Sequence, residues 1–308
     1  MFIILVMNGL FVGLTTLDII YLADHFPHSN EKIVALDQTI AAGGPATNAA
    51  ITFQKFGHQG TLLSMIGNHP ISQLICAELE DCSLSVFDLA PYHPEPPPTS
   101  SIIVNKTTGE RAVISINAIK SQAKADKLSL EILQDIDIIL IDGHQMAVSQ
   151  VVAQEAHFRD IPIIIDGGSW KPGFEKILPY VKYAVCSANF YPPNCYDGDD
   201  VFAYLKQVGV PHIAITNGEK PIKYWTDGEF NSIEVSSIKA VDTLGAGDVF
   251  HGAFCHFILT HSFVDSLAKA SEVAAVACQS FGTRQWMENL TDFGVKNYQK
   301  SKNTDLFF

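Results

Sequence analysis

From residue 135 onward, short and almost continuous apolar runs alternate with segments whose apolar residues recur at helical spacing. A strand without alternating polar residues is buried on both faces, which is typical of a parallel sheet covered by helices on both sides. Four such runs lie at 136–141, 161–165, 183–187 and 212–216. The pattern therefore predicts an α/β fold, a doubly wound and mostly parallel sheet flanked by helices.

The first eighty residues continue this pattern. Strand candidates lie at 8–14 and 61–66. A helix is expected to begin at Pro45 and to end at Gly57, because proline suits the first helical position and glycine the end of a helix. Residues 70–80 predict a second helix.

A smaller β layer is predicted between these regions. Residues 91–98 hold five prolines, so they cannot join a central strand and are expected to form an extended connector. The β-rich runs 99–105 and 111–117 flank a turn with the chemistry of a hairpin. Together with another extended piece, these runs predict a small β lid from discontinuous segments at about 31–41 and 86–117.

Toward the C-terminus, the pattern predicts a second hairpin and then two helices. The hairpin strands are expected at 222–226 and 230–235, and the helices at about 247–260 and 263–280. With 308 residues and 47% apolar content, the chain can form one large domain, and we expect a single domain over residues 1–308.

The charge and the cysteines restrict the partners and the compartment. A net charge of -13 argues against nucleic acid or an anionic membrane as a partner, although backbone amides can still bind an anionic substrate. The six cysteines form no Cys-x-x-Cys pair and no zinc spacing, so we expect reduced thiols in a cytoplasmic protein. Residues 1–14 are too short to span a bilayer and lack the features of a signal peptide, and 2–6 are expected to be an extension before the first strand.

The stretch 241–254 carries the clearest chemistry, because a glycine-rich turn runs directly into an apolar helical pattern. Gly245 and Gly247 permit positive φ and a close approach of phosphate to the backbone. The N–H groups at a helix start can bind an anion, and Asp248 in the first turn is kept ionised by the macrodipole. An anion site with a carboxylate at its mouth suits phosphoryl transfer to an alcohol.

An ordinary helix start, with Asp248 as a first-turn acid, is the alternative interpretation of this stretch. The stretch is not a dinucleotide fingerprint, because Phe250 occupies the position of the third glycine. It also lacks the Gly-Lys-Ser/Thr ending of a Walker A loop. A dehydrogenase is therefore not predicted.

A second glycine-rich stretch precedes the first helix. Gly43 and Gly44 would let a ligand press against the backbone, Asn48 follows within the helix, and Asp18 lies just beyond the first strand. Carboxylate and amide groups suit the recognition of neutral hydroxyls. The alternatives are a plain strand-to-helix turn, an asparagine facing solvent, and a loop acid or helix cap.

Polar residues also follow the predicted parallel strands, where ligands of open α/β sheets gather. They are Asp142, Asp166, Ser187 with Asn189, and Thr216 with Asn217 and Gly218. Loops begin at such positions in any α/β protein, so about half of these residues are expected to be structural.

The stretches 242–254 and 43–50 resemble the C-terminal and N-terminal signatures of the ribokinase-like (PfkB) carbohydrate kinases. The resemblance covers about 8–285 and implies an ATP-dependent sugar kinase that transfers the γ-phosphoryl group to a sugar hydroxyl. It implies that Asp248 is the general base. The anion hole would consist of Gly245, Ala246, Gly247 and Asp248.

The same resemblance implies where the sugar binds. Asp18, Gly43, Gly44 and Asn48 would contact its hydroxyls under the lid. Asp142 occupies a place where the family often has an acidic residue facing the sugar, although a helix cap is an equal alternative for it. The Leu17-Asp18 context, the glycine pair and the step after Asp142 also resemble the ketohexokinases.

The nucleotide side is implied in the same way. Asn189, Thr216 and Gly218 would bind ATP together with Mg²⁺, although a tight β-turn needs the last two residues as well. The family usually has an Asn-x-x-Glu step, and this chain has Pro192 in place of the glutamate. The metal ligands are therefore left open, with Asp166 or water held by the phosphates as alternatives.

Several further expectations remain open. A nucleoside kinase of the same fold should show an aromatic wall near the lid, and Pro192 keeps open a non-catalytic sugar- or nucleotide-binding regulator. The resemblance implies a homodimer through the lid and a monovalent cation near Asp242. Arg111, after the hairpin turn, would close on the substrate or lie solvated.

Overall fold

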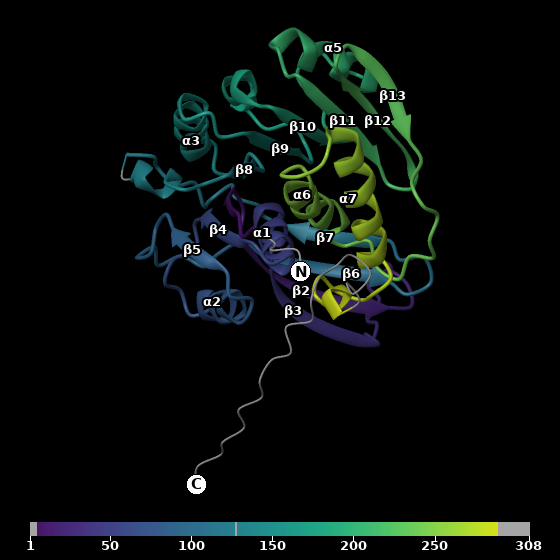
Figure 1. Ribbon diagram of the computed structural model, residues 1–308. Helices are drawn as coiled ribbons and strands as arrows, with labels where there is room; N and C mark the ends of the chain where they lie inside the picture. Colours follow the sequence, from purple (N-terminus) through teal and green to yellow (C-terminus); the bar gives the residue numbers. More distant parts are fainter. Residues whose placement is uncertain (1–4, 127, 289–308) are drawn as a thin grey trace.

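The computed structural model describes residues 5–126 and 128–288, and its strands form two sheets (Figure 1). Within these residues the larger sheet has nine strands in the order β13-β12-β11-β10-β9-β8-β1-β4-β5. The strands from β11 to β5 run parallel, and β12 and β13 add an antiparallel hairpin at one edge. Their bounds are β1 Asn8–Val12, β4 Gln59–Ser64, β5 Ser85–Asp88, β8 Ile138–Ile141, β9 Ile163–Gly167, β10 Tyr183–Ser187, β11 His212–Asn217, β12 Lys220–Thr226 and β13 Glu229–Ile233.

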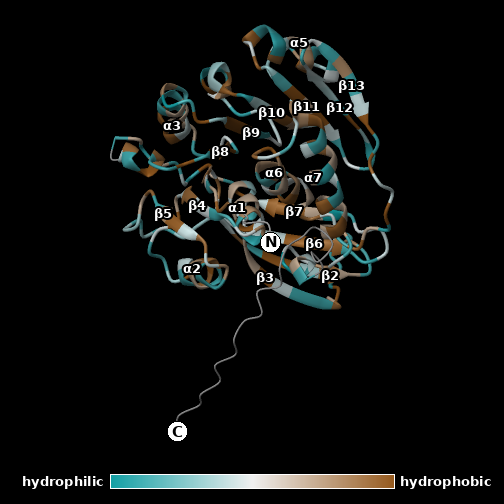
Figure 2. Cartoon of the chain, in the orientation of Figure 1, coloured by the Kyte–Doolittle hydropathy of each residue, from teal (hydrophilic) through white to brown (hydrophobic). Residues whose placement is uncertain are grey.

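Helices cover both faces of this sheet, because successive strand side chains enter two different apolar cores. Phe11 of β1 packs in the core under α1, α2, α6 and α7, whereas Leu10 packs in the core under α3, α4 and α5. Hydrophobic and hydrophilic residues alternate around the outer helices (Figure 2). The helices are α1 Pro45–Lys55, α2 Ser72–Asp81, α3 Met146–Phe158, α4 Phe174–Ile177, α5 Gly198–Val208, α6 Ala246–Phe257 and α7 Phe263–Ala277, with 3-10 turns at Leu130–Leu133 and Leu178–Tyr180. The predicted doubly wound sheet is confirmed.

The smaller sheet has four strands in the order β3-β2-β6-β7. They are β2 Thr16–Ala23, β3 Asp37–Gly43, β6 Thr99–Asn105 and β7 Arg111–Ser115, and only the β2–β6 pair is parallel. Ile20, Ile102 and Val104 of this sheet form a small core against Leu244 and Phe281. The small sheet therefore packs directly on the glycine-rich turn that precedes α6.

Two predicted parts of the small layer differ from the structure. Strand β2 was not predicted, so Asp18 lies inside a strand and not in a loop beyond β1. Residues 85–88 pair in parallel with β4 at the edge of the large sheet and do not join the small one. The local pattern around these residues does not distinguish the sheets, because the strands with which they pair lie elsewhere in the chain.

Most other predicted elements are confirmed within one to three residues, including the helices after Pro45 and Gly245 and both hairpins. Residues 2–4 of the expected N-terminal extension lie outside the described part of the chain. Among the residues that are described, no helix has the length and apolar content needed to cross a membrane.

Candidate active site

The glycine-rich turn is held in shape by Asp242. Its Oδ1 accepts the N–H of Leu244 at 2.8 Å, and its Oδ2 accepts the N–H of Gly282 at 2.9 Å. Gly245 has φ 70° and serves as the N-cap of α6. The next N–H groups belong to the first helical turn, where they have no intrahelical acceptor and can bind an anion. This arrangement fits the predicted anion hole.

Asp248 of α6 and Asn48 of α1 meet across this turn. The Nδ2 of Asn48 donates to Oδ2 of Asp248 at 2.7 Å, although the residues lie 200 positions apart in the sequence. The helices approach closely at Gly252, where a Cβ would lie 2.4 Å from the carbonyl oxygen of Ala49 and 2.6 Å from the Cβ of Thr52. Because Asp248 and Gly252, like Asn48 and Thr52, are one helical turn apart, this close contact brings the two polar side chains together.

Arg284 is the next hydrogen-bond partner of Asn48, and the sequence pattern did not predict this contact. Its Nη1 donates to Oδ1 of Asn48 at 2.9 Å, and its Nε donates to Oε1 of Glu78 at 2.8 Å. Its Nη2 donates to the carbonyl oxygen of Ala42, whose own N–H donates to Oε2 of Glu78. One signal was available, because the chain has only three arginines and this one follows shortly after the helix predicted at 263–280.

Asp18 lies beside the glycine pair. Its Oδ1 accepts the hydroxyl of Thr16 at 2.6 Å, and a Cβ at Gly43 would lie 1.9 Å from its Oδ2. Gly44 has φ 98°, and a Cβ there would lie 2.2 Å from the carbonyl oxygen of Leu14. The glycines are therefore needed for the packing of the chain itself. Burial raises the pKa of the Asp18 carboxyl, although hydrogen bonds and the charge of Arg284 oppose the rise.

Asp142 has a different environment from Asp18. Its Oδ2 accepts the N–H of Leu14 at 2.8 Å and that of Ala46 at 3.2 Å, and its Oδ1 accepts the N–H of His144 at 2.8 Å. Burial alone would raise the pKa of this carboxyl, but the charge and hydrogen bond of His144, the N–H of Leu14 and the charge of Lys171 together outweigh burial and lower the pKa. Asp142, directly after β8, thus joins the loop that follows β1 to the first turn of α1, an arrangement that favours the alternative of a structural cap.

Asp166 and His251 also lie close enough to Asp248 to affect its charge. The Nδ1 of His251 lies 3.5 Å from Oδ2 of Asp166 and 2.7 Å from the carbonyl oxygen of Gly247, and its Nε2 lies 3.1 Å from the carbonyl oxygen of Val185. The sequence pattern did not predict these contacts. They hold the first turn of α6 against β9 and β10.

Burial raises the pKa of the Asp248 carboxyl to about 7, and the nearby charge of Asp166 contributes to the rise. Asn48, His251 and Arg111 act in the opposite direction. A carboxyl with a pKa close to neutral is well suited to accept a proton from a reacting group and to release it afterwards. The expectation that the helix macrodipole keeps Asp248 ionised is therefore wrong, because burial outweighs it, but a nearly neutral pKa is compatible with general-base chemistry.

The predicted ATP-binding residues lie at two neighbouring strand ends. Ser187 of β10 and Thr216 of β11 are paired in the sheet, and Gly218 follows with φ 57°. The hydroxyl of Thr216 donates to the carbonyl oxygen of Cys186 at 3.3 Å, and Asn189 is exposed. Strand β10 adjoins β9, which carries Asp166, and β11 is one strand further along the sheet.

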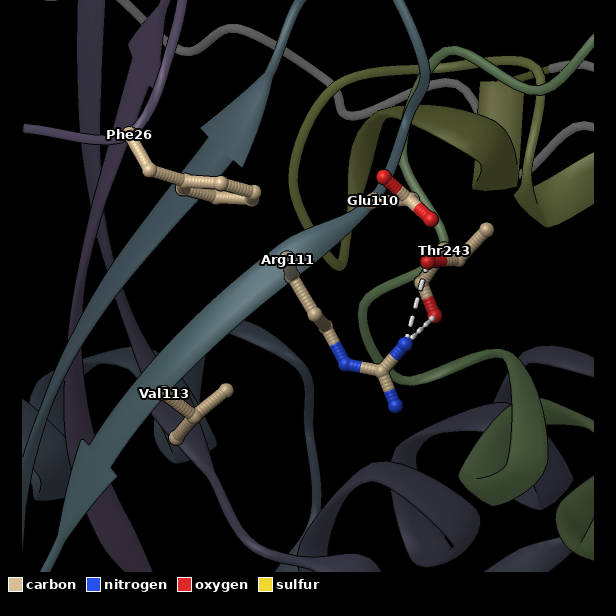
Figure 3. A pocket seen from close by; sticks show the side chains of 5 residues that line it. All are labelled: Phe26, Glu110, Arg111, Val113 and Thr243. Carbon is tan, nitrogen blue, oxygen red and sulfur yellow. Dashed lines mark hydrogen bonds between the residues drawn. The ribbon is translucent and has the colours of Figure 1, made fainter.

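Arg111 connects the small sheet to the turn (Figure 3). Its Nη1 donates to both the carbonyl oxygen and the hydroxyl of Thr243, each at 3.0 Å. A cavity of about 590 Å³ lies here, and it is lined by Phe26, Glu110, Arg111, Val113 and Thr243. The other terminal nitrogen of Arg111 points away from Thr243 in Figure 3. The cavity therefore has a cationic wall next to the turn and an aromatic wall across from it.

The side chains near the site offer few ligands to a metal ion. Among residues 5–126 and 128–288, no three His, Cys, Asp or Glu side chains are grouped so that they could hold a metal ion. Mg²⁺ needs few protein ligands when phosphates and water complete its shell, so the residues are compatible with a phosphate-bound Mg²⁺. Because both oxygens of Asp242 accept backbone N–H groups, we assign no ligand to a monovalent cation.

Comparisons with known proteins agree on one family. Residues 9–290 match the model of the pfkB family of carbohydrate kinases. A deoxyribokinase of Salmonella typhi is 26% identical over 305 aligned residues, covering 92% of this chain and 96% of that protein. The Arabidopsis thaliana ribokinase complexed with ribose and ATP has a TM-score of 0.73 at 21% identity, with 90% of this chain and 94% of that chain covered. An E. coli structure described as a ribokinase II in complex with ATP and Mg²⁺ has a TM-score of 0.76 at 16% identity, with 94% and 99% covered.

Proposed function

The chain belongs to the pfkB family of carbohydrate kinases, phosphotransferases with an alcohol acceptor, and we propose that it transfers the γ-phosphoryl group of ATP to a sugar hydroxyl. The observation that carries this proposal is the contact between Asn48 and Asp248 at the mouth of the amide-lined turn. It places a carboxylate with a nearly neutral pKa next to a helix that carries polar groups suited to hydroxyls.

In the proposed reaction, Asp248 accepts the proton of the attacking hydroxyl. The N–H groups of Gly245, Ala246, Gly247 and Asp248 stabilise the charge on the transferring phosphoryl group. Mg²⁺ bound to ATP would supply further neutralisation of the phosphate charge. Asp18 and Asn48 would orient the acceptor so that one hydroxyl lies in line with the phosphoryl group.

The small sheet would act as the lid over this acceptor. Arg111 holds the start of β7 to Thr243, so the lid and the anion-binding turn are tied together. A closed lid excludes water and limits wasteful hydrolysis of ATP. Pairing of this sheet between two copies of the chain stays a prediction; Ile40, Val113 and Ile114 are exposed on its strands.

A nucleoside acceptor is the second candidate, because Phe26 lines the cavity beside the small sheet. An aromatic ring at this place could stack on a base. The two candidates share Asp248 and the turn, and they differ only in what fills the cavity.

The direct test is ADP release from Mg-ATP with a panel of pentoses, hexoses, ketoses and nucleosides. We expect one class of acceptor to be phosphorylated, with kcat/KM rising as the pH rises through about 7, because only the deprotonated Asp248 accepts a proton. Activity restricted to nucleosides would favour the second candidate. ATP binding without ADP release across the panel would contradict catalysis and favour a regulator.

Replacement of Arg111 by methionine should free the lid from the anion-binding turn, because it removes the hydrogen bonds to Thr243. A charge-assisted hydrogen bond contributes about 1.5–3 kcal/mol, so we expect the KM of the acceptor to rise about tenfold or more. ATP hydrolysis without acceptor should rise relative to sugar phosphorylation, because water enters the open site. The matched control is Lys106→Met, which removes an exposed cation from the same hairpin and should change neither quantity. If the ratio of ATP hydrolysis to sugar phosphorylation is the same in the two variants, the proposed role of the Arg111–Thr243 contact is contradicted.

A further inference from the structure

Three of the four hydrogen-bond partners of Arg284 lie 206, 236 and 242 residues before it in the sequence. Its guanidinium donates to Glu78 of α2, to Asn48 of α1, and to carbonyl oxygens of Ala42 and Thr283. The side chain is 22% exposed, and that of Glu78 is 23% exposed. Two of these partners adjoin the acceptor side of the site, because Ala42 precedes the glycine pair and Asn48 contacts Asp248.

The chemistry of these groups fixes the direction of each hydrogen bond. A guanidinium can only donate, so the atom of Asn48 that faces Arg284 must be its carbonyl oxygen. The amide nitrogen of Asn48 must then face Asp248, and it can only donate. A flipped amide would set an oxygen against the carboxylate, which is favourable only when Asp248 holds a proton.

We propose that Arg284 is a positioning residue for phosphoryl transfer, which fixes the amide of Asn48 so that Asp248 is held as an ionised acceptor for the hydroxyl proton. This inference rests on the proposed function. Glu78 supports the arrangement, because its two oxygens bind Nε of Arg284 and the N–H of Ala42. The alternative is a purely structural role, in which Arg284 only attaches the C-terminal segment to α2 and β3.

The titration of Asp248 distinguishes these roles. The groups that face Asp248 come from four elements: Asn48 from α1, Asp166 from β9, His251 from α6 and Arg111 from β7. All four residues remain in the chain when Arg284 is replaced, and among them only Asn48 loses a hydrogen bond to Arg284. A change in the titration of Asp248 after that replacement therefore reports on the orientation of the Asn48 amide.

The first experiment compares the pH dependence of kcat in the wild-type protein, Arg284→Met and Arg284→Lys. In the methionine variant we expect the acidic limb to move upward by about one pH unit, so that kcat near pH 7 falls about fivefold and recovers at higher pH. The KM of ATP should change less than about twofold. Lysine keeps the charge, but its single ammonium lacks the fork that reaches Asn48 and Glu78 together, so we expect a shift in the same direction.

If the midpoint of the acidic limb of kcat is unchanged in Arg284→Met, or if the lysine variant behaves as the wild type, the proposal is overturned. The matched control is Arg159→Met, which removes an arginine that pairs with Glu155 on the surface of α3. Its midpoint and kcat should equal those of the wild type. If Arg284→Met does not fold, Glu78→Gln serves instead, since its amide oxygen can still accept the N–H of Ala42; it should give a smaller upward shift, and no shift would overturn the proposal.

A double-mutant comparison tests whether Arg284 acts through Asn48. In an Asn48→Ala background, Arg284→Met should lower kcat by less than about a further twofold, because the amide that Arg284 orients is already absent. If the fall in kcat of the double variant equals the product of the falls in the two single variants, Arg284 acts independently of Asn48, and the proposal is overturned.

A measurement without turnover separates this inference from the proposed function. The carboxyl carbons of ¹³C-labelled aspartates can be titrated by NMR, with Asp248 assigned from the Asp248→Asn spectrum. We expect its midpoint to rise by about one pH unit in Arg284→Met. If this rise occurs in a protein that phosphorylates no acceptor, the proposed function fails while the positioning by Arg284 stands. A constant midpoint in an active kinase refutes only the positioning role.

Discussion

Replacement of Asp248 by asparagine should lower kcat by about 10²–10⁴-fold, the range that general acid–base catalysis contributes. Asparagine keeps the size of the side chain and can still accept the hydrogen bond of Asn48, but it cannot take up the hydroxyl proton. The backbone N–H groups of the turn are unchanged, so ATP affinity should stay within about threefold. Single-turnover kinetics together with ATP titration would measure both quantities.

The matched control for this variant lies on the next helix. Asp265 of α7 occupies the same position relative to its N-cap, Ser262, as Asp248 does relative to Gly245. Asp265→Asn therefore removes a first-turn acid without touching the site, and it should leave kcat unchanged. If Asp248→Asn and Asp265→Asn have equal activity, Asp248 is only an ordinary first-turn acid and the proposed mechanism is refuted.

Gly252→Ala should impair both stability and catalysis, although alanine normally favours a helix over glycine by about 0.5–1 kcal/mol. The new Cβ would lie 2.4 Å from the carbonyl oxygen of Ala49, so the backbones of α1 and α6 must move apart. Such overpacking costs about 1–3 kcal/mol and outweighs the gain in helix propensity. The movement also separates Asn48 from Asp248, and a misplacement of about 1 Å can lower the rate about 10²-fold.

Thermal unfolding and kcat would be measured on the same preparation of this variant. Gly198→Ala is a suitable control, because a Cβ at this first residue of α5 would meet only Ile215 Cδ1 at 3.7 Å, an ordinary contact. The control should keep wild-type stability and activity. A fully active and stable Gly252→Ala protein would show that the close helix contact does not position the Asn48–Asp248 pair.

The large sheet could be predicted from the sequence because its central strands are apolar throughout and are separated by helical periods. The turn before α6 was also predictable, because glycines and a carboxylate at a helix start restrict the local backbone and charge. These are short-range properties. They place Asp248 and Asn48 on their helices, but they do not say that the two side chains meet.

The elements that were not predicted depend on tertiary contacts. Strand β2 carries apolar residues that suit several environments, and only its pairing with β3 and β6 makes it part of the small sheet. Arg284 gives no local signal either, because its partners lie 206, 236 and 242 residues away in the chain. Asp142 was predictable as a residue at a strand end, but its three backbone N–H partners, which favour the cap, appear only in the folded chain.

The close contact of α1 with α6 also bears on the synthesis of the chain. Asn48 leaves the ribosome long before Asp248, which follows 200 residues later. Until α6 is made, the face of α1 around Ala49 and Thr52 has no helix to cover it. A chain interrupted before α6 therefore leaves this face uncovered and lacks Asp248, the proposed proton acceptor. In the completed chain, the helix that covers this face of α1 also carries the hydrogen-bond partner of Asn48.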